Sequence, residues 1–331
     1  MRAIVLHAPG EPHTFALQEL PIPEPGPGEI RVRIQAASLN PADYKMAKNG
    51  NPAWMYPFVP GLDAAGIVDK VGEGVTEWAE GDRVVYHGNF TKPGTFAEYG
   101  IVQARAAARI GDGLTYQEAA AFPCAGLTAY QALNRKMNVQ AGSSILVHAG
   151  AGGVGGYAVQ LAKAFGASPI LATASTENFD YVKSLGADYV IDYNAENVHE
   201  RVMALTEGRG VDCILNGVNR QTAQADLSML SFGGQLACIA GAPETVADFQ
   251  PSHKTFSVHK LMLSGAYLSG DERAVQDLSA MAEQFMALMA AGKVDPMIGK
   301  LIALEEIPQE LTRLSQRHVR GKIVVDLERR I

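Results

Sequence analysis

A glycine-rich segment at residues 148–156, HAGAGGVGG, has the spacing of a phosphate-binding loop. Gly150, Gly152 and Gly155 fit the pattern G-x-G-x-x-G, with a short apolar run before it and helical periodicity from Val154 onward. In such a strand–loop–helix unit, the first glycine permits a tight turn, the second lets the backbone approach a pyrophosphate, and the third lets the helix pack closely on the strand. The start of the helix also offers unpaired N–H groups and a positive dipole end to phosphate.

This loop predicts a dinucleotide site, and the alternative is a glycine-rich turn with a structural role only. The residues expected to lie against the phosphates are Gly150, Gly152, Gly153 and Val154. An NAD site usually places Asp or Glu at the end of the second strand, where it binds the ribose hydroxyls. Here the second strand reads PILATASTEN, and neutral Thr173 stands at that position.

The residues after this strand favour NADPH as the cofactor. Ser175 and Thr176 can donate hydrogen bonds to a 2′-phosphate, and Tyr193 after the third strand could stack beside the adenine. Two features oppose this reading, because the loop contains no Lys or Arg and Glu177 is acidic. Arg320, near the carboxyl end, either supplies the missing cation or is an ordinary surface charge, and the sequence leaves both readings open.

The elements around this loop alternate between strands and helices. Short apolar runs after residue 142 lie at 144–148, 169–173, 189–192, 211–215, 235–240 and 261–266. Segments of helical periodicity lie at 154–165, 180–185, 198–206 and 271–291. This alternation predicts an α/β fold with a doubly wound parallel sheet and helices on both faces. Residues 1–110 are instead rich in Pro and Gly between short alternating runs, which predicts a β-rich domain with tight turns. Thr115 and Glu118 form a capping box that predicts a helix start.

The composition limits the possible classes of function. Lys and Arg number 28 against 35 Asp and Glu, a net charge of −7, so binding to nucleic acid or an anionic membrane surface is not expected. The three cysteines are dispersed and form neither a disulfide framework nor a CxxC zinc clamp. No apolar run approaches the ~20 residues of a membrane span, and the amino terminus resembles a first strand more than a signal peptide. We expect a soluble cytoplasmic protein, and its 331 residues suggest about two domains.

The chain resembles the medium-chain dehydrogenase/reductase superfamily, and within it the zinc-independent quinone oxidoreductase branch. The resemblance covers nearly the whole chain and rests on segments in the family's order, namely PGPGEIRVRIQAASLNPADYK, PGLDAAGIVDKVGEGV, GDRV, GTFAEY, GLTAY, AGAGGVGG, LGADYVIDY and GKIVV. It implies a GroES-like β-barrel domain followed by a Rossmann domain, with the chain's end returning to the first domain. The expected division is residues 1–124 plus 294–331 for the GroES-like domain and 125–293 for the Rossmann domain.

The resemblance also implies roles for individual residues. The nicotinamide ring would be bordered by residues of three segments, namely Thr128, Ala240, Gly241, Ala266 and Tyr267. Asn40 and Tyr44 of NPADYK would line the substrate side, with Asn40 orienting the acceptor or the nicotinamide ribose. A tyrosine hydroxyl, with an ordinary pKa of about 10, is a credible acid. Tyr44 therefore either donates a hydrogen bond or a proton to the acceptor oxygen, or is a wall aromatic without a proton role. Delivery of the proton by water is a further alternative.

The zinc ligands of the alcohol dehydrogenases in this superfamily are not matched. Their Gly-His-Glu is replaced by a segment containing Leu62 and Asp63, and their first cysteine falls near Pro41. Cys124 stands where the last ligand would be, but a catalytic zinc site usually takes three protein ligands. Asp63 and His87 could be a vestigial ligand pair, although a lone histidine is more often hydrogen-bonded within the structure. We therefore expect no metal.

Without zinc to stabilise an alkoxide, a conjugated acceptor is the easier substrate, because the charge left by hydride addition delocalises to its oxygen. The expected function is NADPH-dependent reduction of a small quinone or an activated enone. One alternative is a 2-enoyl thioester reductase, and another is a nucleotide-binding scaffold or sensor whose catalysis is dispensable. The resemblance implies a homodimer or homotetramer, for which an outer strand at residues 261–268 would supply an unpaired edge.

Overall fold

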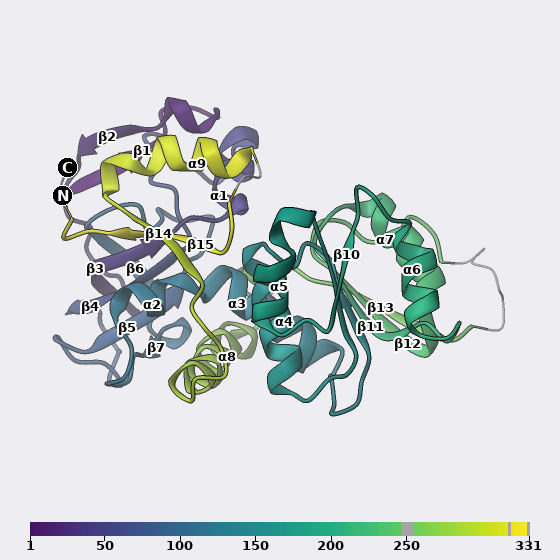
Figure 1. Cartoon of the computed structure of the whole chain (residues 1–331). Helices are drawn as coiled ribbons and strands as arrows, with labels where there is room; N and C mark the ends of the chain where they lie inside the picture. The colour runs from purple at the N-terminus through teal and green to yellow at the C-terminus, as the bar shows by residue number, and fades with distance from the viewer. Residues whose placement is uncertain (247–253, 317–318, 330–331) are drawn as a thin grey trace. The chain divides into compact units, whose positions relative to one another are not determined.

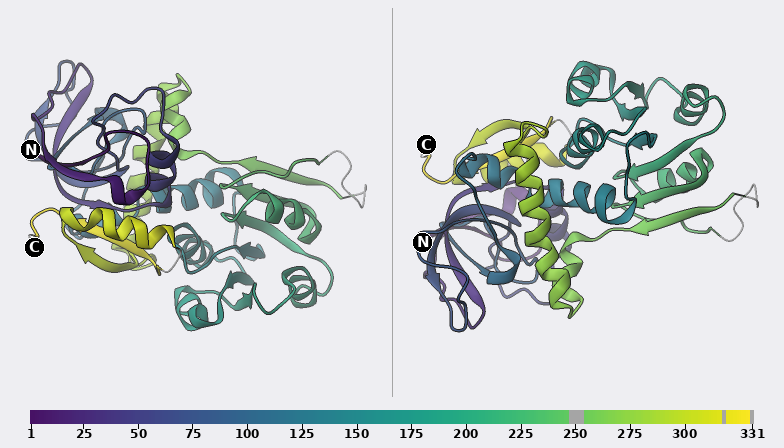
Figure 2. Two further views of the ribbon diagram at one scale, coloured as in Figure 1. Left: turned by 90° about the horizontal axis from the view of Figure 1, so that it is seen from above. Right: turned by 90° about the horizontal axis from the view of Figure 1, so that it is seen from below.

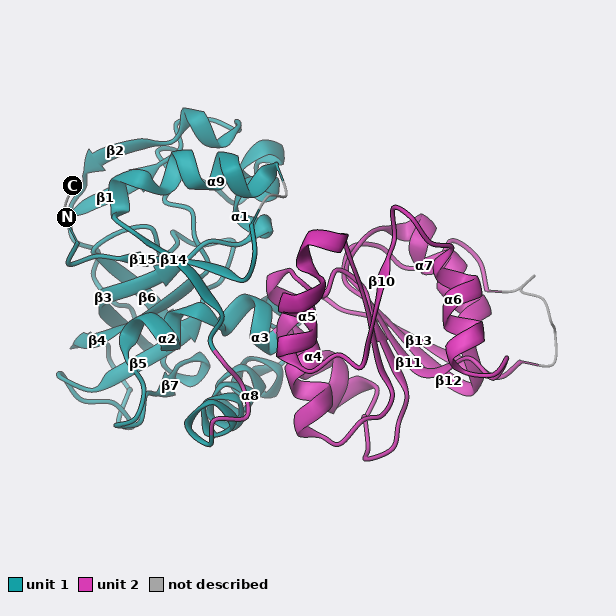
Figure 3. Ribbon diagram, in the orientation of Figure 1, with its two compact units in different colours: residues 1–127, 263–291, 296–331 teal, residues 128–262, 292–295 magenta. Residues whose placement is uncertain are grey.

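The computed structural model describes residues 1–246, 254–316 and 319–329, and the chain divides into two compact units (Figures 1 and 3). Unit 1 consists of residues 1–127, 263–291 and 296–331, and unit 2 consists of residues 128–262 and 292–295. This division differs from the expected one at residues 125–127 and 263–291, which group with unit 1, and at residues 294–295, which group with unit 2. In the segment 263–291 the ring of Phe285 stacks on Phe122, with the ring centroids 4.8 Å apart.

Unit 1 is built on a mostly antiparallel sheet. Its strands are β1 (Arg2–Val5), β2 (Ala16–Glu19), β3 (Glu29–Ser38), β4 (Asp63–Val71), β5 (Arg83–His87), β6 (Tyr99–Gln103), β7 (Ala108–Arg109), β14 (Ile298–Ile302) and β15 (Lys322–Asp326). The main sheet has the order β14-β15-β3-β4-β5-β7, with β6 paired to β3, while β1 and β2 form a separate hairpin. Val324 of β15 lies opposite Ser38 of β3, so the chain's end returns to the first unit, as the resemblance implied.

The helices of unit 1 begin at residues that favour a helix start. They are α1 (Pro41–Asn49), α2 (Tyr116–Ala121), α3 (Pro123–Tyr130, which continues into unit 2), α8 (Glu272–Ala290) and α9 (Ile307–Ser315), with 3-10 turns η1 (Pro12–Thr14), η2 (Ala104–Ala106), η6 (Leu263–Leu268) and η7 (Leu304–Glu306). The predicted capping box precedes α2, because Glu118 N donates to Thr115 Oγ1 at 3.2 Å and Thr115 N donates to Glu118 Oε2 at 2.8 Å. Helix α9 contacts α1 and η1, and both views of Figure 2 show the yellow carboxyl-terminal segment beside the purple amino-terminal one.

Unit 2 is the predicted doubly wound parallel sheet. Its strands are β8 (Ile145–Val147), β9 (Ile170–Ala174), β10 (Tyr189–Asp192), β11 (Val211–Asn216), β12 (Leu230–Cys238) and β13 (Phe256–Lys260). The helices and turns are η3 (Gln131–Lys136, a π-helical turn), α4 (Gly153–Ala164), η4 (Thr176–Asn178), α5 (Phe179–Leu185), α6 (Val198–Leu205), α7 (Arg220–Asp226) and η5 (Leu227–Met229). The order β10-β9-β8-β11-β12-β13 is parallel throughout. Figure 1 shows α4 and α5 on one face and α6 and α7 on the other, as right-handed crossovers require.

One strand prediction was wrong. The expected strand at 261–266, and with it the outer strand at 261–268, is replaced by the 3-10 turn η6, which belongs to unit 1. The outer strand of the sheet is instead β13, five residues earlier, where Val258 lies opposite Leu236 of β12. The polar residues Ser257, His259 and Lys260 break up its apolar run, so composition alone pointed to the more apolar segment that follows.

Candidate functional site

The glycine-rich loop connects β8 to α4 in unit 2, as predicted. A side chain on Gly155 would place its Cβ 2.1 Å from the backbone oxygen of Ala149, so the helix can lie this close to the loop only with glycine there. A Cβ on Gly152 would meet only Ala149 O, at an ordinary 3.4 Å, so the other side of this residue is open. Gly152 is the N-cap of α4, and the first amides of a helix have no acceptor within it. The loop can therefore bind an anion through its backbone.

Thr173 fixes this loop from the neighbouring strand. Its Oγ1 accepts a hydrogen bond from Ala149 N at 3.1 Å, and its backbone oxygen accepts one from Gly150 N at 2.9 Å. His148 Nδ1 lies 3.3 Å from the same Oγ1, and His148 Nε2 lies 2.8 Å from Oδ1 of buried Asp226. Thr173 is 2% exposed, so its hydroxyl holds the loop rather than facing a ribose. The sequence did not predict that Thr173 and His148 hold the loop. This role depends on contacts between distant residues, including the contact of His148 with Asp226, which lies outside any motif.

The hydroxyls expected to bind a 2′-phosphate already contact carboxylates. Ser175 Oγ is 3.0 Å from Glu177 Oε1, and Thr176 Oγ1 donates to Asp192 Oδ2. The Thr176 hydroxyl lowers the pKa of Asp192, so this carboxylate is ionised. Tyr193, directly after Asp192, is exposed. Because β9 and β10 are parallel neighbours, these residues share the carboxyl edge of the sheet with the loop.

The remaining residues predicted to contact the cofactor fall in both units. Ala240 and Gly241 follow β12 at the same carboxyl edge of unit 2, and Thr128 is a buried residue of α3. Ala266 and Tyr267 lie in η6 of unit 1. Arg320, also in unit 1, is exposed. The structure therefore brings the loop, Thr173, Ser175, Thr176, Tyr193, Ala240 and Gly241 to one sheet edge.

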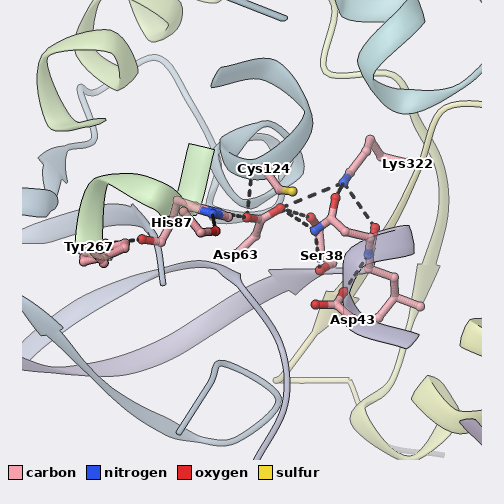
Figure 4. A network of polar contacts seen from close by, with 10 residues as sticks. Ser38, Asp43, Asp63, His87, Cys124, Tyr267 and Lys322 are labelled. Atoms are coloured by element: carbon pink, nitrogen blue, oxygen red, sulfur yellow. Dashed lines mark hydrogen bonds and ion pairs between the residues drawn. The ribbon is translucent and has the colours of Figure 1, made fainter. Parts of the chain in front are cut away.

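A buried polar network in unit 1 includes Ser38, Asp63 and Lys322 (Figure 4), and hydrogen bonds link Asn40 to Asp63 and Lys322. Lys322 Nζ donates to Asn40 Oδ1 at 2.6 Å, and Asn40 Nδ2 donates to Asp63 Oδ2 at 2.7 Å. Ser38 Oγ donates to the same Oδ2 at 2.9 Å, and Lys322 Nζ lies 3.9 Å from it. All four residues are at most 3% exposed. Both ends of the Asn40 amide are thus hydrogen-bonded to protein, which makes Asn40 a residue that positions its neighbours. Lys322 stands in the GKIVV segment, and no other feature of the sequence predicted its part in this network.

The second oxygen of Asp63 joins this network to His87. Asp63 Oδ1 accepts hydrogen bonds from Cys124 N at 2.8 Å and from His87 Nδ1 at 3.1 Å. His87 Nε2 lies 2.9 Å from Ser264 Oγ, and the Tyr267 hydroxyl donates to the backbone oxygen of His87. Burial raises the pKa of Tyr267, which keeps it a neutral donor. The pairing of His87 with Asp63 agrees with one of the two readings of the sequence, a histidine hydrogen-bonded within the structure.

The start of α1 carries Tyr44 beside a buried carboxyl group. Asp43 is 1% exposed, and its Oδ2 accepts a hydrogen bond from Asn40 N at 2.7 Å. Its Oδ1 has no hydrogen-bond partner among the described residues. Burial, reinforced by the charge of Asp63, raises the pKa of Asp43 well above its usual range. Asn40 and Asp43 therefore fix the first turn of α1, and Tyr44 is a half-buried residue of that turn.

Two family models match this chain. A model described as "Alcohol dehydrogenase GroES-like domain" matches residues 26–112, and one described as "Zinc-binding dehydrogenase" matches residues 153–287. Where the zinc-dependent alcohol dehydrogenases have the histidine of their Gly-His-Glu, this chain has Leu62. The Leu62 side chain is 3% exposed within the apolar core and offers no ligand atom. Within the described part of the chain, no helix is long and apolar enough to cross a membrane.

Several proteins are similar to this chain over nearly its whole length. The chain is 31% identical to the chloroplastic quinone-oxidoreductase QR1 of Triphysaria versicolor, over 93% of this chain and 92% of that protein. It is 32% identical to a quinone oxidoreductase of Pseudomonas aeruginosa, over 98% of this chain and 99% of the relative. The structure resembles that of Escherichia coli quinone oxidoreductase complexed with NADPH, with a TM-score of 0.87, 27% identity and coverage of 98% of this chain and 100% of that one.

Proposed function

Because the chain belongs to the medium-chain dehydrogenase/reductase superfamily, in its quinone oxidoreductase branch, we propose that it transfers a hydride from NADPH to a quinone or an activated enone without a catalytic metal. It is an oxidoreductase of the medium-chain type acting on a small molecule. The observation that carries the proposal is the open side of Gly152 at the start of α4.

The loop in unit 2 fits the pyrophosphate of a nicotinamide dinucleotide. Gly155 allows α4 to begin close to Ala149, and Thr173 holds Ala149 and Gly150 in place by hydrogen bonds. The amides at the start of α4 then point at the bound phosphates, where the helix dipole favours negative charge. When bound, NADPH supplies the hydride.

The choice of NADPH over NADH rests on the second strand. Thr173 is neutral and buried near the end of β9, and neutral Ser175 follows the strand, so no carboxylate at either position repels a 2′-phosphate. Ser175 and Thr176 would exchange their bonds to Glu177 and Asp192 for bonds to the phosphate. Because two carboxylates compete for these hydroxyls, we expect the preference for NADPH to be modest.

On the acceptor side, Tyr44 donates a hydrogen bond or a proton to the oxygen of the substrate. The Lys322–Asn40–Asp63 network fixes the residue that precedes α1, and Asp43 ties the first turn of α1 to the same point. These contacts fix the backbone of the turn that carries Tyr44, which lowers the entropic cost of positioning an acid. A conjugated acceptor spreads the developing charge, so the protein needs no Lewis acid at the oxygen.

The proposal can be tested by measuring NADPH oxidation with a small quinone, an enone, an enoyl-CoA and a simple aldehyde. Reduction of the quinone or enone is expected. A marked preference for enoyl-CoA would favour the thioester reductase, and NADPH binding without any reduction would favour a scaffold or sensor. Tyr44→Phe should lower kcat on an enone by about 100-fold, the lower range for a general acid, and leave NADPH affinity unchanged. Tyr189→Phe, an exposed residue at the start of β10, is the control. A change in KM alone would make Tyr44 a wall residue without a proton role.

We also propose that the chain forms a homodimer or homotetramer. The outer strand β13 is paired on one side by β12 and ends the sheet order on the other. An open strand edge is commonly covered by a second subunit. Sedimentation of the purified chain would test this, and a monomer at micromolar concentration would contradict it.

A further inference from the structure

Three side chains of the kinds that bind transition metals meet inside unit 1 (Figure 4). They are Asp63 of β4, His87 of β5 and Cys124 of α3, and their ligand atoms all lie within 4.8 Å of one another. Among residues 1–246, 254–316 and 319–329, this is the one group of three or more His, Cys, Asp or Glu side chains close enough together to hold a metal ion. We propose that Asp63, His87 and Cys124 form a binding site for a divalent transition-metal ion of the zinc type, beyond the hydride-transfer function proposed above.

The backbone already places the ligands at suitable positions. Asp63 and His87 are direct partners across the antiparallel pair β4–β5, so their side chains point to the same face of the sheet. Zinc binds nitrogen and oxygen at about 2.0–2.2 Å and sulfur at about 2.3 Å, so tetrahedral ligand atoms lie about 3.3–3.6 Å apart. His87 Nδ1 and Asp63 Oδ1 are 3.1 Å apart. The other separations, at most 4.8 Å, need to close by about 1.5 Å or less, which is within reach of side-chain rotation.

The partners that orient such ligands are also present. A metal-bound histidine usually donates its second ring N–H to an oxygen, which fixes the tautomer. Ser264 Oγ lies 2.9 Å from His87 Nε2 and can accept that hydrogen bond, since a hydroxyl both donates and accepts. Asp63 Oδ2 is held by Ser38 and Asn40, which leaves Oδ1 facing His87 and Cys124. Metal binding therefore breaks the His87–Asp63 hydrogen bond and leaves the contacts to Oδ2 in place.

This ligand set differs from that of the zinc-dependent dehydrogenases. Leu62 occupies the position of their histidine, whereas His87 supplies its nitrogen from the adjacent strand. The Cys124 thiol loses its proton to the buffer on binding, and the dication forms bonds to the thiolate sulfur, the imidazole nitrogen and the carboxylate oxygen. Lys322, 3.9 Å from Asp63 Oδ2, balances the carboxylate in the metal-free protein and opposes a cation. The affinity is therefore expected to be below that of a dedicated structural zinc site.

The test is a titration of the chelator-treated full chain with Co²⁺, read by absorption and without any enzyme assay. Tetrahedral Co²⁺ with one thiolate gives visible ligand-field bands and a near-ultraviolet sulfur-to-cobalt band, and Zn²⁺ should displace both. Cys124→Ser should abolish the sulfur band. Cys213→Ser and Cys238→Ser remove the two buried cysteines outside the site, so both should keep it. His87→Gln should weaken binding by more than about tenfold, since losing even an outer partner of a ligand costs about 10–100-fold.

The outcomes decide the proposal in either direction. A sulfur-to-cobalt band that is lost in Cys124→Ser alone among the three cysteine variants, and weakened in His87→Gln, supports the site. No thiolate band in the unmodified chain at saturating Co²⁺ overturns it, as does a band that persists in Cys124→Ser. Circular dichroism checks that each variant is folded. If Cys124→Ser does not fold, alkylation of the folded chain with and without Zn²⁺ replaces it, and Cys124 must then be protected by the metal.

Discussion

Replacing Gly152 by valine separates cofactor binding from folding more cleanly than any other change in the loop. A Cβ at this position meets only Ala149 O, at 3.4 Å, which is an ordinary contact. Gly152 also has φ of −81°, which a branched residue can adopt. The fold should therefore lose no more than about 1 kcal/mol, the usual effect of a poorer N-cap. The added side chain instead occupies the open side of the loop, where the pyrophosphate is expected.

The expected loss of affinity follows from the hydrogen bonds that the phosphates would lose. A hydrogen bond to a charged group is worth about 1.5–3 kcal/mol. If the side chain pushes the phosphates away from one backbone amide, Kd for NADPH should rise by about ten- to hundredfold, because 1.4 kcal/mol corresponds to a factor of ten. Loss of further amides would raise Kd more.

Nicotinamide fluorescence during titration with NADPH gives Kd, and thermal unfolding without cofactor gives the stability of each variant. Gly113→Val is a matched control, because a Cβ at Gly113 meets nothing within 4 Å and this glycine lies outside the loop. The control should bind NADPH as the unmodified chain does. The reasoning is refuted if Gly152→Val binds NADPH within about twofold of the unmodified chain while folded. It is also refuted if Gly113→Val loses as much affinity.

Three further predictions follow from the same contacts. Gly155→Ala places a Cβ 2.1 Å from Ala149 O, so it should cost at least about 1–3 kcal/mol of stability and lower Tm by several degrees in a thermal melt; an unchanged Tm would contradict this packing. Ser175→Asp should shift the ratio of NADPH to NADH affinity towards NADH by about tenfold or more, since a carboxylate repels the 2′-phosphate and accepts from the ribose hydroxyls; fluorescence titration with both cofactors measures it, and an unchanged ratio would place the adenosine ribose elsewhere. Burial raises the pKa of Asp43, so its neutral form stabilises the fold below about pH 4, and this stability is lost as the pH rises towards the raised pKa. The side chain of the Asp43→Asn variant cannot ionise, so the Tm of this variant should rise relative to that of the unmodified chain as the pH increases from about 4. If the Tm of the two proteins changes in parallel with pH, the pKa of Asp43 is not raised.

Thr173 shows what the place of a residue along a strand can and cannot indicate about cofactor binding. The sequence predicted that Thr173 stands where an NAD enzyme has its acid, and β9 does include Thr173. Side chains alternate between the two faces of a strand, and which face carries the loop depends on the neighbouring β8. In the structure Thr173 is directed at Ala149 and His148. An aspartate there would be buried beside the loop, so Ser175, just after the strand, is the better position for a charge.

The amino-acid sequence by itself determined the local features of this protein. The glycine spacing, the capping box at Thr115 and the alternation of apolar runs predicted the loop, the start of α2 and the parallel sheet, because each depends on residues close together in the chain. The prediction of a strand at 261–266 was wrong, because the position of an edge strand depends on residues far apart in the chain. An edge strand is chosen by which segment can pair with β12, and the polar segment 256–260 pairs there although its neighbour is more apolar.

Only the tertiary structure decided how the buried charges are arranged. Asp63 lies 24 residues from His87 and 61 from Cys124 in the sequence, and Lys322 comes from the far end of the chain. Pairing of β15 with β3 and of β4 with β5 brings them to one carboxylate. A buried charge is costly unless other groups compensate it, so these residues must be satisfied together. No local sequence pattern predicts which distant partner each buried polar residue contacts, because the contacts depend on the register of strands that pair only in the folded chain.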